Sequence, residues 1–115
     1  METYISVKEA LQKKAGNVSL RGWVYRIRTQ KSNVFIMLRD ESGIIQLVAW
    51  KDKLSEKDFK TAQSLGIEAS ILVSGVLRKE ERSPQGYEID IDSLELVGSS
   101  DNYPISKDFS EEFLL

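Results

Sequence analysis

Residues 34–50 read VFIMLRDESGIIQLVAW, and this stretch decides the fold of the chain. Its apolar side chains recur at every second residue, which is the spacing of a β-strand with one buried face. A short polar turn, Asp40 to Gly43, divides the stretch and ends in glycine, as the turns of β-hairpins often do. The stretch therefore predicts a β-hairpin whose second strand runs from Ile44 to Trp50.

The alternation also assigns the two faces of this hairpin. The residues predicted to face the core are Val34, Ile36, Leu38, Ile45, Leu47 and Ala49. Those predicted to face away from it are Phe35, Met37, Arg39, Gln46 and Val48. A shift of one residue in this alternation would instead put Phe35 in the core. An aromatic ring and an amide are thus expected on one outer face of neighbouring strands.

The residues before the hairpin predict a short helix and a long strand. Ser6 and Glu9 have the spacing of a capping box, and Gly16 is expected to end the helix that they begin. From Val18 the apolar period changes to two, which indicates a strand. Gly22 is expected to form a bulge that lets this strand bend.

The residues after the hairpin predict a second helix and two more strands. Ser55 to Asp58 form another capping box, and an apolar stripe at helical spacing follows it up to Gly66. The two strands are expected at residues 70–78 and 87–97, joined by a polar turn that contains proline and glycine.

The predicted order is helix, three strands, helix, two strands. Three strands, a helix and two strands is the order of the OB fold, a partly open Greek-key barrel. We therefore predict an all-β domain with two short helices, a five-stranded OB-fold Greek-key barrel over residues 1–98. Residues 99–115 lose the periodicity and are expected to be a linker. An open α+β sheet is the alternative fold.

Composition narrows the function. The chain has 115 residues, which suits one domain, and it contains no cysteine and no histidine. Disulfides and thiolate metal sites are excluded, and the commonest general base and metal ligand are missing. A hydrolase triad or a zinc centre is therefore not expected, although chemistry based on carboxylates stays open. We expect no catalytic residues and no metal site. No apolar run has the length of a membrane span and no signal-peptide pattern opens the chain, so we expect a cytoplasmic protein.

Charge is unevenly distributed along the chain. Residues 1–60 carry twelve Lys or Arg against seven Asp or Glu, whereas residues 61–115 carry four against eleven. An acidic protein can still bind phosphates through one locally positive face. Arg21, Arg26 and Lys31 belong to the basic half and are candidates for contacts with a nucleic-acid backbone.

The outer face of the predicted strands offers groups that could recognise nucleobases. Phe35 offers a surface for stacking, and the amide of Gln46 can pair with the Watson–Crick edge of a base. Glu88 and Asp90, on the last strand, offer carboxylates that accept from the N1–H and amine of guanine. Arg28 lies at the end of the first strand. Splayed bases of an RNA loop are recognised through such groups.

Four ordered motifs resemble the N-terminal domain of class IIb aminoacyl-tRNA synthetases, which are the aspartyl, asparaginyl and lysyl enzymes. The motifs are RGWVYRIR at 21–28, FIMLRD at 35–40, GIIQ at 43–46 and YEI at 87–89. The resemblance covers essentially the whole chain and implies an OB-fold domain that binds the anticodon of tRNA. It implies that Phe35 stacks on the middle anticodon base, a uridine, that Gln46 pairs with it, that Glu88 recognises the first base, and that Arg28 lies nearby.

Residues 99–115, the expected linker, distinguish among the three enzymes of this family. NYPI at 102–105 and EFLL at 112–115 resemble the linker of asparaginyl enzymes, which implies tRNA(Asn) as the partner. The intervening residues 106–110 are less basic than in that family, so an archaeal-type aspartyl enzyme stays an alternative. The resemblance implies that this chain is a piece of a longer, homodimeric enzyme, and that ATP and Mg²⁺ bind only its catalytic domain.

Two other functions remain open. A general single-stranded nucleic-acid-binding OB domain would line its groove with several aromatic and many basic residues. A barrel that binds only proteins would bind no tRNA.

Overall fold

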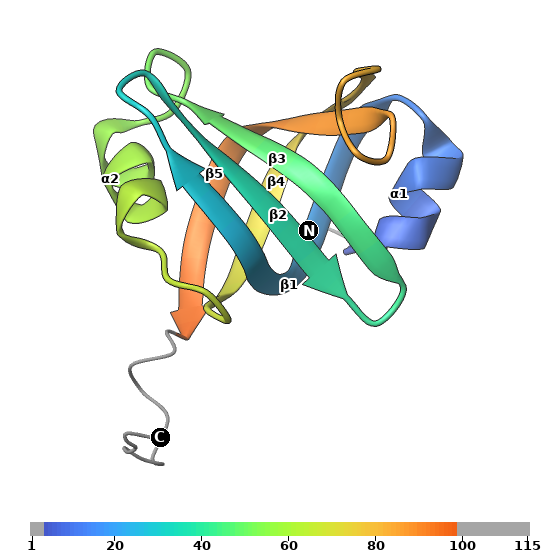
Figure 1. Ribbon diagram of the computed structural model, residues 1–115, viewed down its shortest axis with the longest axis horizontal. Coiled ribbons are helices and arrows are strands. Elements are labelled where there is room, and N and C mark those ends of the chain that lie inside the picture. The colour runs from blue at the N-terminus through green and yellow to red at the C-terminus, as the bar shows by residue number, and fades with distance from the viewer. Residues whose placement is uncertain (1–3, 99–115) are drawn as a thin grey trace.

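The hairpin predicted from residues 34–50 is present in a computed structural model of the chain, which describes residues 4–98 (Figure 1). Its strands are β2, Asn33–Asp40, and β3, Gly43–Trp50. The other elements are α1 (Val7–Lys13), β1 (Gly16–Thr29), α2 (Glu56–Ser64), β4 (Ser70–Lys79) and β5 (Tyr87–Gly98). The predicted order of helices and strands is confirmed. The predicted linker, residues 99–115, lies outside the described residues.

The five strands close into a barrel in the order β1-β2-β3-β5-β4, with β4 pairing back onto β1. This closure confirms the five-stranded barrel and rules out the open α+β sheet. Four of the pairings are antiparallel, and β3 with β5 is parallel. The parallel pairing has three residue pairs, Gln46 with Glu88, Leu47 with Ile89 and Val48 with Asp90. We call these three pairs the closure seam.

The barrel interior is filled by the residues that the alternation assigned to it. Val34, Ile36, Leu38, Ile45, Leu47 and Ala49 are all fully buried, so the predicted parity of the hairpin is confirmed. Val48 is fully buried too, although it belongs to the outer face. Its neighbours in register are Phe35 on one side and Asp90 on the other, and a side chain between two larger ones loses its contact with water.

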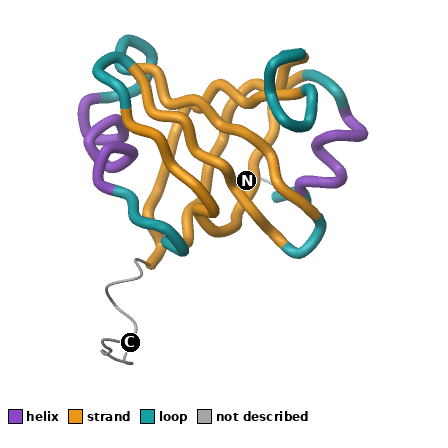
Figure 2. Tube along the Cα trace, in the orientation of Figure 1, coloured by secondary structure: helices purple, strands orange, loops and turns teal. Residues whose placement is uncertain are grey.

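The two helices lie at opposite sides of the barrel (Figure 2). The capping box of α1 is present, since Ser6 Oγ accepts from the Glu9 backbone and Glu9 accepts from the Ser6 backbone. The helix ends earlier than predicted, with Lys14 in the left-handed region, and Gly16 starts β1. The second box is only half formed. Ser55 caps the Asp58 backbone, but the Asp58 carboxylate accepts from Leu94 N at 3.3 Å instead.

Neither helix within residues 4–98 is long and apolar enough to cross a membrane.

The bulge predicted at Gly22 lies elsewhere. The register of β1 against β2 shifts between Val24 and Arg26, which places the extra residue at Tyr25. Gly22 is needed for another reason: a Cβ there would overlap the backbone carbonyl of Arg39, so glycine lets β1 and β2 approach closely. Because of the bulge, Ile27 packs against the core after Val24.

Candidate nucleic-acid interface

An open groove of about 560 Å³ runs over the outer face of β2, β3 and β5. All four residues predicted to contact an anticodon line it, namely Arg28, Phe35, Gln46 and Glu88. Its walls are completed by Trp50, Arg78, Glu80 and the β4–β5 loop from Arg82 to Pro84. We call it the outer groove. The structure thus brings together side chains from five segments that are far apart in the sequence.

Arg28 reaches the outer groove because of the bulge at Tyr25. An uninterrupted alternation from Val24 would turn Arg26 and Arg28 toward the core. The extra residue reverses this, and Arg28 becomes the direct cross-strand partner of Phe35. Its guanidinium carbon lies 4.6 Å from the centre of the Phe35 ring.

This guanidinium covers part of the surface that a stacked base would need. Phe35 is half-buried and out of the core, as predicted, while Arg28 is exposed. An exposed cation–π contact stabilises by about 0.5–1 kcal/mol, whereas a stacked base contributes about 1–3 kcal/mol. A base can therefore displace Arg28, whose charge is then free to meet a phosphate.

The amide of Gln46 has a fixed orientation. Its Nε2 donates to Oε2 of Glu88, its partner across the closure seam. Because an ionised carboxylate only accepts hydrogen bonds, the NH₂ group must face Glu88. One N–H of Gln46 and its Oε1 are left without a hydrogen-bond partner among residues 4–98. They offer one donor and one acceptor side by side to the groove.

Arg78 binds the carboxylates at the bottom of the groove. Its guanidinium pairs with Glu88, with Glu80 at 3.1 Å and with Asp90 at 2.8 Å. The hydrogen bond to Asp90, above all, raises the pKa of Arg78 against the opposing effect of burial, so the guanidinium stays charged. Glu88 is only 4% exposed, which the sequence did not predict for a base-reading residue. Its Oε1 faces Arg78 and its Oε2 faces Gln46.

Asp90 connects this network to Trp50. Its Oδ1 accepts from the indole Nε1 of Trp50 at 3.0 Å, and its Oδ2 accepts from Nε of Arg78. Burial alone would raise the pKa of Asp90, but the hydrogen bonds from Arg78 and Trp50 outweigh it and hold the pKa below its usual value. Asp90 is therefore ionised at neutral pH.

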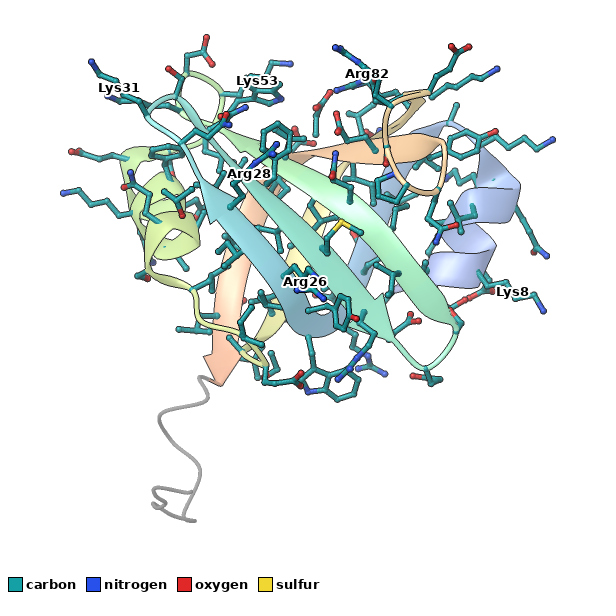
Figure 3. All side chains as sticks on the ribbon, viewed as in Figure 1. Lys8, Arg26, Arg28, Lys31, Lys53 and Arg82 are labelled. Carbon is teal, nitrogen blue, oxygen red and sulfur yellow. The ribbon has the colours of Figure 1, made fainter. Side chains whose placement is uncertain are left out.

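The predicted backbone contacts are spread over the molecule. Among them, Lys31 lies at the end of the barrel near Arg28 (Figure 3). Two cations that were not predicted are also nearby: Lys53 lies at the same end, and Arg82 lies across the groove (Figure 3). Arg26 lies farther along β1, with its guanidinium over Tyr25. Arg21 is on a different wall. It pairs with β4 and lies over the Tyr4 ring, so the structure does not bring it to the groove.

The sequence reasoning missed Trp50, Arg78 and Arg82. Parity carried a signal for the first two. Trp50 shares the outer face of β3 with Gln46, and Arg78 alternates with the inward-facing Leu77 on β4. Arg82 belongs to a loop whose position over the groove has no periodic signal.

Comparisons with known proteins agree with this geometry. Residues 18–97 match a tRNA anticodon family described as an OB-fold nucleic acid binding domain. The asparagine–tRNA ligase of Thermoplasma acidophilum is 51% identical over 98 residues, which are 85% of this chain and 23% of that protein. The corresponding ligase of Chloroflexus aurantiacus is 48% identical over 99 residues, 85% of this chain and 22% of that protein.

A solved structure has the same fold. The asparaginyl-tRNA synthetase of Pyrococcus horikoshii, in complex with asparaginyl-adenylate, superimposes with a TM-score of 0.80 at 30% identity, over 96% of this chain and 26% of that one. The chain spans about a quarter of the length of these relatives. With a closed five-stranded barrel, a groove of aromatic, amide and basic groups, and a match over residues 18–97, the chain belongs to the tRNA anticodon family of OB-fold nucleic acid binding domains.

Proposed function

We propose that this domain binds the anticodon of tRNA(Asn) as the N-terminal domain of an asparaginyl-tRNA synthetase. The observation that carries the proposal is the outer groove, where a half-exposed ring adjoins an amide of fixed orientation. The relatives at 51% and 48% identity over 85% of the chain are asparagine–tRNA ligases, which supports the asparaginyl rather than the aspartyl alternative.

The groove suits a uridine at the middle anticodon position. A base stacked on Phe35 presents its edge to Gln46, which lies diagonally across the β2–β3 pairing. The N3–H of uridine donates to Oε1 of Gln46, and a uridine carbonyl accepts from the free N–H of Nε2. Cytosine has an acceptor at N3, which would face Oε1. Because Glu88 prevents the amide from turning over, this mismatch is not relieved.

Glu88 suits a guanine at the first anticodon position. Each of its carboxylate oxygens has a second lone pair beyond the bonds to Arg78 and Gln46. The N1–H and exocyclic amine of guanine are two adjacent donors, which the other bases do not offer. Arg78 holds the carboxylate in place, so Glu88 can accept from both.

The remaining expectations concern the full-length enzyme. ATP and Mg²⁺ would bind its catalytic domain, for which these 115 residues supply no motif. We expect that enzyme to be a cytoplasmic homodimer that ligates asparagine to its tRNA. Discrimination against tRNA(Asp), whose anticodon differs at the third position, would come from this domain or from the rest of the enzyme.

Binding of anticodon stem-loops to the 115-residue chain tests the proposal. We expect the loop with the asparagine anticodon, GUU, to bind more tightly than the same loop with cytosine in the middle. Gln46→Ala removes the edge contact but leaves the Phe35 ring, so it should abolish most of the difference between the two loops. Fluorescence anisotropy of labelled RNA gives both affinities.

Two other results of this experiment would contradict the proposal. Equal affinities of the unaltered chain for all loop sequences, and for DNA of the same sequence, would indicate a general single-strand binder. No binding to any loop would indicate a domain that recognises proteins.

A further inference from the structure

Trp50 is an aromatic side chain of the outer groove with no role in reading the middle base. It is the last residue of β3, half-buried, and lines the groove together with Phe35. Phe35 pairs directly with Val48, so Gln46 and Trp50 occupy the two positions diagonal to it. Such diagonal positions are about 7–8 Å apart, within reach of large side chains. The Phe35 ring thus has an amide on one side and an indole on the other.

The indole is held in one orientation. Nε1 of Trp50 donates to Asp90 at 3.0 Å, and Arg78 fixes the other oxygen of Asp90 at 2.8 Å. An indole has a single donor, so this bond satisfies it completely. A bond of this kind would also serve a purely structural tryptophan. Trp50, however, is not in the core cluster, and part of its surface borders the groove.

Positive charge surrounds this end of the groove. Lys31 and Lys53 lie there together with Arg28 (Figure 3). The backbone of a single-stranded nucleic acid that passes from Phe35 toward Trp50 would meet these cations. A rigid ring beside a cationic rim is the usual combination for stacking a base without regard to its sequence.

We infer that Trp50 is a second stacking surface, which holds a nucleobase of the RNA loop adjacent to the base on Phe35. Asp90 and Arg78 act as positioning residues for the indole. The inference rests on the proposed function, because it requires a loop with two neighbouring unstacked bases. It adds a contact that recognises the ring of a base rather than its edge.

The fluorescence of the chain tests this directly, because the sequence has two tryptophans, Trp23 and Trp50. Trp23→Phe leaves Trp50 as the fluorescent indole, and Trp50→Phe leaves Trp23. We expect the asparagine anticodon stem-loop to quench the emission of the Trp23→Phe variant. The same loop should leave the emission of the Trp50→Phe variant unchanged, since Trp23 pairs with Arg39 near one end of β2, whereas Trp50 pairs with Asn33 at the other end.

The RNA affinities of Trp50 variants identify the base that stacks on this indole. Trp50→Leu should weaken binding about tenfold, the usual effect of losing one stacked base, while Trp50→Phe should keep most of the affinity. Asp90→Asn should weaken binding less than Trp50→Leu does. Each loop nucleotide is then replaced in turn by an abasic ribose. When the abasic ribose stands at the position whose base stacks on Trp50, next to the middle base, the unaltered chain and Trp50→Leu should bind the loop with equal affinity.

The failure of this inference differs from the failure of the proposed function. If the chain binds the loop with its uridine preference, but Trp50 emission and the Trp50→Leu affinity are unchanged, then Trp50 is structural and the proposed function stands. If no loop binds the unaltered chain, the proposed function is wrong and this inference with it. The fluorescence arm does not depend on the folding of Trp50→Leu.

Discussion

The outer groove and the start of β4 both expose apolar rings and chains on the barrel surface, yet they differ in what surrounds them. At the start of β4, Trp23, Ile67, Leu96 and Val97 are 40%, 45%, 39% and 60% exposed. We call these four residues the apolar end. Among residues 4–98, no hydrogen bond involves the Trp23 indole, whereas the Trp50 indole is bonded to Asp90.

The difference shows why exposure alone does not identify a binding site. Single exposed apolar side chains are common on soluble proteins and need no function. In the outer groove, the rings of Phe35 and Trp50 adjoin an amide, a guanidinium and carboxylates whose hydrogen bonds fix their directions. Fixed donors and acceptors next to a ring can distinguish one base from another. At the apolar end, the hydrogen bonds described for residues 4–98 include the ion pair of Arg39 with Glu68 but no amide or indole that is held beside a ring.

The largest expected effect is on stability, from Arg78→Met. This change leaves Glu88, at 4% exposure, and Asp90 without their cation. Removing one partner of a buried ion pair costs about 3–5 kcal/mol. Because the Arg78 side chain is 36% exposed, we expect the lower limit, about 3 kcal/mol, in urea unfolding.

Arg39→Met is the matched control near the apolar end. Arg39 pairs with Glu68 at 3.1 Å, but their side chains are 39% and 42% exposed. Such pairs contribute about 0–1 kcal/mol. Equal losses of stability in the two variants would show that the groove network is an ordinary surface ion pair.

The second effect is on RNA affinity, from Phe35→Ala compared with Trp23→Ala. We expect Phe35→Ala to weaken binding of the anticodon stem-loop by about 1–3 kcal/mol, because one stacked base is lost. Trp23→Ala should leave the affinity unchanged, although it removes the larger ring. Circular dichroism melting accompanies the titrations, and a large drop in the melting temperature of Phe35→Ala would place this ring in the core instead.

A smaller effect is expected on the salt dependence of binding. Each phosphate contact to a single strand contributes about −0.7 to the slope of log K against log salt. Lys31→Ala should therefore reduce the slope by about 0.7. Lys8→Ala should not change it, because Lys8 is an exposed lysine of α1 that lies across the molecule from Lys31, at the right of Figure 3. Identical slopes for the two variants would remove Lys31 from the interface.

The smallest effect is a pH dependence of stability. The pKa of Asp90 is lower in the folded chain than in the unfolded one, so its contribution is present above about pH 4 and is lost as the pH falls through the folded value. Asp90→Asn should destabilise the chain at neutral pH, and the difference from the unaltered chain should narrow in acid. Trp23→Leu is the control, because the Trp23 indole has no titratable partner among residues 4–98. The difference in free energy of unfolding between this variant and the unaltered chain should be the same at neutral and at acid pH.

The alternation of inward and outward side chains along residues 34–50 was sufficient to predict the hairpin, with Phe35 and Gln46 on its outer face. Phe35 and Gln46 could be found because strand parity depends only on the residues beside them. The position of the bulge could not be found in this way. Gly22 and Tyr25 are both compatible with a bend, and the choice depends on how closely β1 approaches Arg39 on β2.

The ion-pair network could not be predicted for a similar reason. Sequence places Arg78, Glu88 and Asp90 on outer faces, but the contacts among them depend on the register of β4 against β5. The register also explains why Glu88 is buried, since it pairs with Arg78 on one side and Gln46 on the other. Glu88 is therefore buried at the bottom of the groove, although it belongs to the outer face of its strand.

The closure seam has a consequence for how the domain breathes. It is the short pairing that completes the barrel, and one of its three pairs, Gln46 with Glu88, consists of residues that line the groove. Short ladders open locally at lower free energy than long ones, and a ligand that binds only the closed form suppresses the opening. In deuterium exchange, the amides of residues 46–48 and 88–90 should therefore slow down more than any others when RNA is bound. The closure seam, where the barrel opens most easily, is thus also the pairing that bound RNA would stabilise.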